Sequence, residues 1–173
     1  TLPPDEFPEE NFIRDTYPSL AQYVDADGTL KPHERFMSAD SRETESTEAS
    51  FIIVTTKIRN TGDTAQNADL SPFLRHLDEN GDGTYRLSQP RDKSSPAQES
   101  WKRLTTDGMP FYQSIPDKDW TNELFTTINP GEEIECISVY VADNDCLDSA
   151  YMQYFSDGMA APDTPELYVK VTE

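Results

Sequence analysis

The segment FIIVTTKIR, residues Phe51–Arg59, carries the clearest strand pattern in this chain. Isoleucine, valine and threonine fill six of its nine positions, and β-branched side chains favour strands because they pack well on a pleated surface. Successive side chains of a strand point to opposite faces. One face of this expected strand would therefore hold every second residue: Ile52, Val54, Thr56 and Ile58.

Similar short segments follow, separated by turns rich in Asn, Asp, Gly and Pro. The expected strands are Gln66–Leu70, Phe73–Leu77, Thr84–Leu87, Leu124–Ile128, Glu133–Val141, Ala150–Phe155 and Glu166–Val171. Seven or eight short strands without a long helix predict an all-β fold, specifically an immunoglobulin-like two-sheet β-sandwich. The core is expected to hold the inward apolar residues: Ile52, Val54, Ile58, Leu74, Ile137, Val139, Val141, Leu167, Val169 and Val171.

The remaining sequence predicts long polar loops and an N-terminal extension. Residues 1–24 are an acidic lead-in rich in proline, with a short helical turn beginning at Pro18, a residue suited to the first position of a helix. Residues 25–173 would form the sandwich domain. Within it, residues 38–50 and 88–107 are polar and are expected to be irregular connections.

The charge of the chain excludes several classes of function. Its 173 residues include 14 Lys and Arg against 33 Asp and Glu, which gives a formal net charge of −19. Such a chain is repelled by phosphate backbones and by anionic lipids, so we expect no nucleic-acid partner. The longest apolar run, FIIV, is far shorter than the roughly 20 residues of a membrane-spanning helix. Eight Phe, eight Tyr and two Trp argue against a disordered chain.

Two cysteines, Cys136 and Cys146, lie in no spacing typical of a zinc site. A disulfide between them would close a short loop. If they flank a straight strand and its turn, however, their Cα atoms would lie beyond the roughly 7 Å that a disulfide tolerates. The alternative is a pair of packed free thiols, which behave as small apolar groups. Both alternatives remain open from the sequence.

The order of several motifs resembles one group of known domains. These motifs are DADGTL, FIIVTTKIRNTGD, DENGDGTYRL, INPGEEIECISVYV and LYVKV, between Asp25 and Val171. In this respect the chain resembles the uncharacterised immunoglobulin-like domains of Gram-positive secreted lipoproteins. The resemblance implies an exported, cell-surface-anchored module without catalytic residues, which would reach the membrane only through a lipid anchor upstream of this sequence.

One turn has the spacing of a calcium loop. Asp78, Asn80 and Asp82 alternate before Gly83, as do the first three oxygen ligands of that loop, and Ca²⁺ prefers such oxygen ligands. Position twelve of the pattern is Gln89, where a bidentate Glu is expected. The alternative interpretation is a hairpin turn, in which Asp, Asn and Gly are favoured for backbone reasons. If calcium binds, these three residues are its expected ligands.

Four aromatic residues are the candidate ligand-binding residues, because they fall in the expected loops: Trp101, Phe111, Tyr112 and Trp120. Exposed aromatic side chains on the loops of a sandwich can hold sugars or proteins. The alternative is that they close the ends of the core beneath the loops.

Catalytic patterns are weak in this sequence. The two histidines, His33 and His76, have no nucleophile beside them, and the chain has no G-x-S-x-G segment. We therefore expect an extracellular binding or structural module, not an enzyme, that presents its loops to a protein or a glycan. The alternative is a calcium-stabilised spacer domain of a surface lipoprotein.

Overall fold

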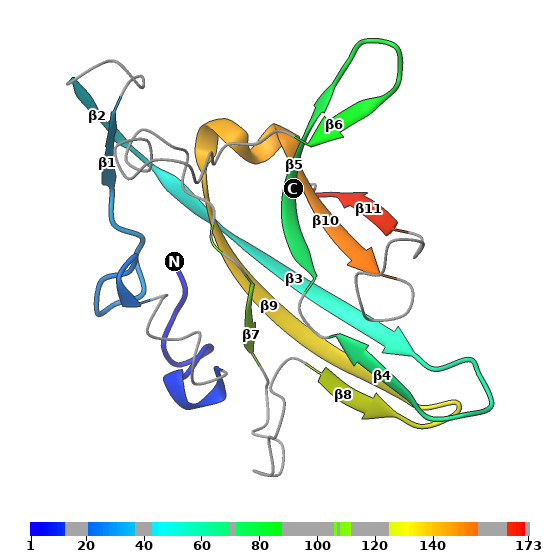
Figure 1. The fold of residues 1–173 in the computed structure, drawn as a ribbon. Coiled ribbons are helices and arrows are strands. Elements are labelled where there is room, and N and C mark those ends of the chain that lie inside the picture. The colour runs from blue at the N-terminus through cyan, green and yellow to red at the C-terminus, as the bar shows by residue number, and fades with distance from the viewer. Residues whose placement is uncertain are drawn as a thin grey trace.

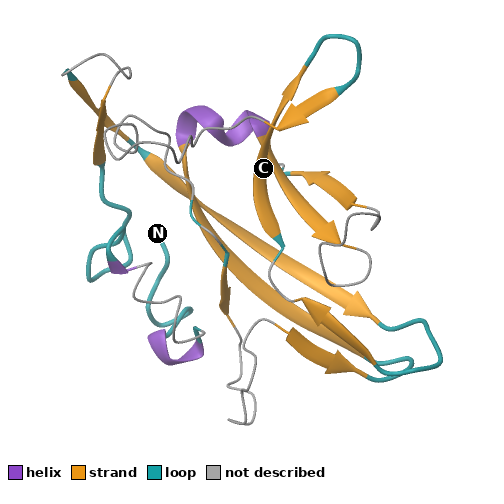
Figure 2. Ribbon diagram, in the orientation of Figure 1, coloured by secondary structure: helices purple, strands orange, loops and turns teal. Residues whose placement is uncertain are grey.

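The computed structural model describes residues 1–12, 21–36, 43–69, 72–87, 106, 108–111, 125–155 and 166–171. Within these residues the chain is predominantly β, all strand pairings are antiparallel, and helix is confined to short turns (Figures 1 and 2). The strands are β1 (His33–Phe36), β2 (Thr44–Thr47), β3 (Ala49–Arg59), β4 (Gln66–Asp69), β5 (Phe73–Glu79), β6 (Tyr85–Leu87), β7 (Met109–Phe111), β8 (Phe125–Ile128), β9 (Glu133–Asp143), β10 (Ala150–Phe155) and β11 (Glu166–Lys170). The 3₁₀-helices are η1 (Glu9–Asn11) and η3 (Asn144–Ser149). The all-β prediction is confirmed.

The two longest strands, β3 and β9, form the centre of the molecule. They pair over their full length, from Ala49 opposite Asp143 to Arg59 opposite Glu133. The predicted face of β3 is confirmed, since Ile52 and Thr56 are buried and Val54 between them is partly buried against the core, whereas Ile53 and Thr55 are exposed. In β9 the six residues from Ser138 to Asp143 are all buried, so both faces of this strand are covered.

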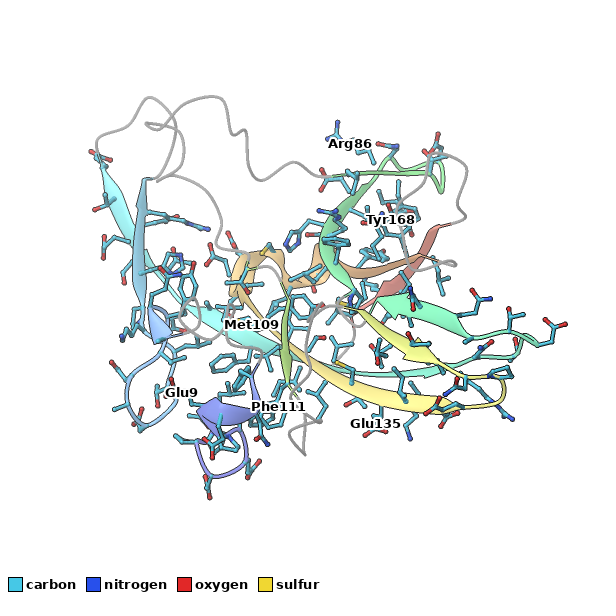
Figure 3. All side chains as sticks on the ribbon, turned by 60° about the horizontal axis from the view of Figure 1, so that its bottom comes forward. Glu9, Arg86, Met109, Phe111, Glu135 and Tyr168 are labelled. Carbon is cyan, nitrogen blue, oxygen red and sulfur yellow. The ribbon has the colours of Figure 1, made fainter. Side chains whose placement is uncertain are left out.

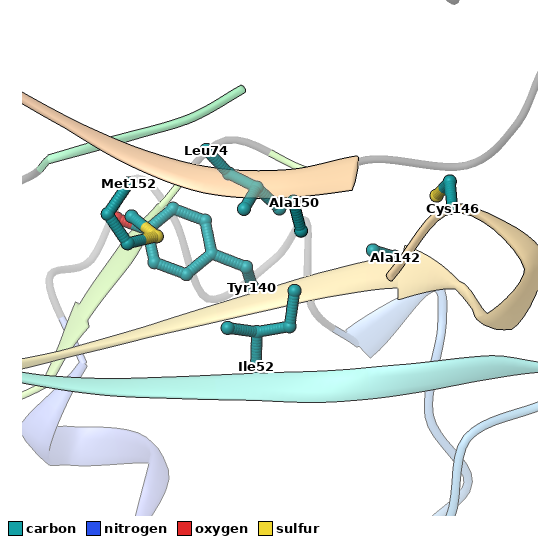
Figure 4. Close-up of a cluster of buried hydrophobic side chains, with 7 residues drawn as sticks. All are labelled: Ile52, Leu74, Tyr140, Ala142, Cys146, Ala150 and Met152. Carbon is teal, nitrogen blue, oxygen red and sulfur yellow. The ribbon is translucent and has the colours of Figure 1, made fainter. Parts of the chain in front are cut away.

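A four-stranded sheet covers one face of the central pair. Its order is β11–β10–β5–β6, and Leu74, Ala150 and Met152 point from it toward Ile52 and Tyr140 (Figure 4). Ala142 and Cys146 complete this buried cluster. Tyr140 is fully buried, and its hydroxyl donates a hydrogen bond to the carbonyl oxygen of Pro72, which satisfies its polar end inside the core.

The N-terminal segment covers the opposite face. Leu2 and Phe12 are buried there against Val139 and Val141 of β9 and against the short strand β7. The backbone N–H of Leu2 donates to the carbonyl oxygen of Gly28 at 2.8 Å. The residues of the expected lead-in thus contribute to the same core as the strands. This layer, formed by residues 1–12, 21–30 and β7, is called the N-terminal layer below.

Most expected strands are confirmed within one or two residues at each end, whereas three strands were missed. Strands β1 and β2 are too polar to show an apolar pattern, and β7 is only three residues long. The helical turn expected at Pro18 lies outside the described residues. Both thiols are free and buried, so Cys136 and Cys146 are packed apolar groups in this structure and form no disulfide.

Two members of the expected core are wrong. Leu167 is 60% exposed and Val169 is 46% exposed. Both belong to β11, which lies at the edge of its sheet, and neither is part of the cluster beneath that sheet. The alternation of apolar and polar residues along a strand shows which side chains share a face. It does not show whether another layer covers that face.

In the part of the chain that the structure describes, no helix is long and apolar enough to cross a membrane.

Gly28 joins the N-terminal layer to its neighbouring turn, and its substitution tests that junction. Its φ of +77° disfavours any side chain, and a Cβ there would overlap the carbonyl of Leu2. We expect Gly28→Ala to lower the free energy of unfolding by about 3 kcal/mol, from backbone strain and displacement of buried Leu2.

The matched control is Gly81→Ala, because Gly81 has a φ of +81° but nothing within 4 Å of the added Cβ. This variant should lose only the strain of about 1 kcal/mol. Urea denaturation of both variants measures the difference, and equal losses would contradict the role of the Leu2 contact.

Candidate functional site

The outward side of the β11–β10–β5–β6 sheet carries a group of aromatic and polar side chains. Leu74 in β5 and Met152 in β10 point into the core. The residues on either side of each of them along its own strand therefore point outward. Strand pairing then aligns two rows across the sheet: Lys170, Tyr151 and Arg75 in one row, and Tyr168, Gln153 and Phe73 in the next. Tyr85 of β6 lies on the same side. These seven residues are called the open face.

A chain of hydrogen bonds fixes the polar groups of the second row. The Arg75 Nε donates to Oε1 of Gln153 at 2.7 Å, and the Gln153 Nε2 donates to the Tyr168 hydroxyl at 3.0 Å. The Arg75 guanidinium carbon also lies 4.8 Å from the centre of the Phe73 ring, a cation–π distance. Gln153 is buried, whereas Phe73 stays 38% exposed. The side chains are therefore held in place before any ligand arrives.

A second aromatic pair lies beside this chain. The rings of Tyr85 and Tyr151 meet edge to face, with their centres 5.9 Å apart. The pKa of Tyr85 is raised above its ordinary value, chiefly by its hydrogen bond to Tyr151 and also by the nearby Tyr151 and Glu79 charges, which disfavour a phenolate. Tyr85 is 51% exposed. The Tyr85 hydroxyl therefore remains protonated at neutral pH and can donate a hydrogen bond.

The structure places the sequence-predicted aromatic residues differently. Trp101, Tyr112 and Trp120 lie outside the described residues. Phe111 lies in strand β7 and not in a loop; it is 2% exposed, and its ring packs 4.9 Å from both Phe7 and Phe12. Figure 3 shows Met109 and Phe111 on the side of the N-terminal layer, away from Tyr168 on the four-stranded sheet. Phe111 thus packs in the core in this structure, as the alternative interpretation of these residues anticipated.

The hairpin between β5 and β6 contains the expected calcium ligands, and its polar groups bond within the hairpin. The Asp82 Oδ1 accepts hydrogen bonds from the N–H and the hydroxyl of Thr84, at 2.9 and 2.5 Å. The Asn80 Nδ2 donates to the same hydroxyl at 2.9 Å, and Asp78 lies 3.6 Å from the Arg86 Nε. Gly81 and Gly83 both have positive φ, as tight turns require. Among the described residues, no group of three or more His, Cys, Asp or Glu could hold a metal ion.

A buried carboxylate, which sequence reasoning missed, lies at the end of β9. Asp143 is fully buried; its Oδ2 lies 3.0 Å from an Arg35 Nη, and its Oδ1 lies 3.0 Å from the His33 Nε2. Arg35 also bonds to Asp145 at 2.9 Å and to Glu45 at 2.8 Å. These hydrogen bonds, chiefly the one to Asp145, raise the pKa of Arg35 above its ordinary value. The cluster therefore fastens the β1–β2 hairpin to the central strands.

Among the described residues, this cluster consists of ion pairs that hold strands together. Within the described part of the chain, no nucleophile lies within hydrogen-bond distance of the buried ring nitrogens of His33. Arg35 forms ion pairs with three carboxylates, those of Glu45, Asp143 and Asp145. The open face, in contrast, presents the partly exposed rings of Phe73 and Tyr85 at the surface.

A comparison of this chain with protein-family models, curated proteins and solved structures finds no match.

Replacing the buried carboxylate tests the cluster at the end of β9. We expect Asp143→Asn to lower the free energy of unfolding by about 3 kcal/mol, because it removes one partner of a buried ion pair. Asp25→Asn is the control, since Asp25 pairs with Lys31 at 3.9 Å on the surface and should change stability by less than about 1 kcal/mol. Chemical denaturation distinguishes the two cases, and a small loss in both would show that the cluster contributes little.

The calcium hypothesis has a direct test. Because the Asp82 Oδ1 already accepts two hydrogen bonds from Thr84 within the hairpin, we expect the same melting temperature in millimolar CaCl₂ and in EDTA. A rise in calcium that Asp82→Asn abolishes would show instead that the loop binds the ion.

Proposed function

We propose that this chain is a binding module and that the open face of its β11–β10–β5–β6 sheet binds a glycan. The observation that carries this proposal is the fixed chain from Arg75 through Gln153 to Tyr168 beside partly exposed aromatic rings. A sugar ring has an apolar C–H face that packs on aromatic side chains, and hydroxyls that exchange hydrogen bonds with amides, phenols and guanidinium groups.

The size of the face favours a sugar over a folded protein. Between β11 and β6 it is about 14 Å wide, and along β5 it is about 20 Å long, whereas a stable protein interface needs about 800 Å² from each partner. The face offers about a third of that area, which matches a few sugar rings. Held side chains also reduce the conformational entropy that a small ligand must overcome on binding.

The location expected from the sequence belongs to the same proposal. An exported module displayed at a cell surface would meet glycans there. This part of the proposal rests on the resemblance to the immunoglobulin-like domains of secreted lipoproteins, as does the finer description of the fold as an immunoglobulin-like sandwich.

Binding to immobilised oligosaccharides tests the proposal. We expect at least one member of a panel of xylo-, gluco-, galacto- and manno-oligosaccharides to bind. Tyr85→Ala and Tyr151→Ala should each weaken that binding about tenfold, because each removes a ring on which a sugar can pack.

Tyr23→Ala supplies the matched control, because it makes the same chemical change within the N-terminal layer, on the other side of the central strands. It should leave the affinity unchanged. Failure of the whole panel to bind would overturn the proposal, as would an equal loss in the control. Circular dichroism shows that each variant is folded.

A further inference from the structure

Some of the described Lys and Arg side chains form ion pairs with carboxylates, and others do not. Four of the Lys and Arg side chains that the structure describes lie in ion pairs: Lys31, Arg35, Lys57 and Arg86. Among the described residues, Arg59, Arg75 and Lys170 have no carboxylate within 4.0 Å. With 33 acidic residues in the chain, carboxylates are abundant, so an unmatched cation calls for explanation.

Two of these three cations lie in one row of the open face. Arg75 and Lys170 stand on either side of Tyr151 in the strand register, with Cα atoms about 10 Å apart by the usual strand spacing. Lys170 is the direct cross-strand neighbour of Tyr151, so its side chain leaves the sheet on the same side as the pair of tyrosines. Glu79 lies on the same side but at the far end of β5, opposite Tyr85.

Arg75 has donors left for a ligand. Its Nε is used by Gln153 at 2.7 Å, and this bond holds the plane of the guanidinium beside the Phe73 ring. In the described part of the chain, neither Nη has a hydrogen-bond partner in the protein. A guanidinium held by one edge presents its remaining N–H groups as a planar fork, which matches the geometry of a carboxylate.

We propose that the glycan bound by the open face carries a carboxylate, as a uronic acid does, and that Arg75 and Lys170 bind this group beside Tyr151. This inference rests on the proposed function and adds the chemical class of the ligand. The Arg75 fork donates to the carboxylate, Lys170 supplies a second positive charge, and the tyrosine rings contact the sugar.

The charge of the whole chain limits how many carboxylates such a ligand carries. A net charge of −19 repels a dense polyanion, whereas local cations dominate for a single carboxylate, because salt screens charges beyond about 8 Å at physiological ionic strength. We therefore infer a glycan with isolated carboxylates on a neutral backbone.

Two matched ligands test the inference by isothermal titration calorimetry. One is a xylo-oligosaccharide bearing a single glucuronic acid, and the other is the same molecule after its carboxyl group has been reduced to an alcohol. We expect the acidic form to bind about tenfold more tightly, as hydrogen bonds to a charged group do, and this ratio to fall as NaCl is added.

Two variants test whether Lys170 and Arg75 cause the preference for the acidic ligand. Lys170→Met leaves the Arg75–Gln153–Tyr168 chain in place and should reduce the ratio of the two affinities severalfold. Arg75→Gln should bring that ratio close to one. Arg59→Gln is the control, because Arg59 is also without an ion pair among the described residues but lies at the far end of β3, and the ratio should not change.

The outcomes separate the two proposals. Equal binding of both ligands to the unmodified chain would overturn the carboxylate inference and leave glycan binding standing. A preference for the acidic ligand that persists in Arg75→Gln and Lys170→Met would also overturn it. Binding of neither ligand, together with failure of the wider sugar panel, would overturn both proposals.

Discussion

The antiparallel pairing of β3 with β9 is the constraint on which the rest of this structure depends. Eleven residues of each strand are paired without a break, and the second half of β9 is buried on both faces. Apolar surface on both sides of one ladder needs a covering layer on each side. The four-stranded sheet supplies one layer, and the N-terminal segment with β7 supplies the other. The open face exists because the four-stranded sheet has its other side turned away from that ladder.

The centres of the apolar strands could be predicted from the sequence. Strands β1 and β2 and the end of β9, which are held by polar contacts, could not. Segments such as Phe51–Arg59 have β-branched residues that favour a strand wherever they lie. Strand β9 continues to Asp143 because Arg35 and His33 surround its carboxylate, and charged residues are rarely expected inside a core. Strands β1 and β2 pair through polar side chains, with Arg35 opposite Glu45. Leu2 and Phe12 were missed because prolines and acids surround them, without any periodic pattern.

The candidate site shows a different limit of sequence reasoning. Its residues stand at alternate positions in β5, β10 and β11, and alternation could have placed each pair on one face of its own strand. The register that brings Arg75, Tyr151 and Lys170 into one row comes from strand pairing over long sequence separations. A shift of one residue would have sent these side chains to the opposite face. The sequence pattern therefore favoured the loop aromatics as ligand-binding residues, whereas Phe111 lies in the core.

The attachment of Leu2 beneath Gly28 has a mechanical consequence. A pulling force applied at Thr1 first reaches the Leu2–Gly28 hydrogen bond and then the contacts of Phe12 with Phe111. These contacts load one after another, so residues 1–12 would peel away at low force while β7 stays paired with β9, and their departure would expose the apolar surface that Leu2 and Phe12 cover. The ladder of β3 and β9 carries the load only afterwards. Tension at this end would thus uncover one side of the central strands while the sheet with the open face stays folded.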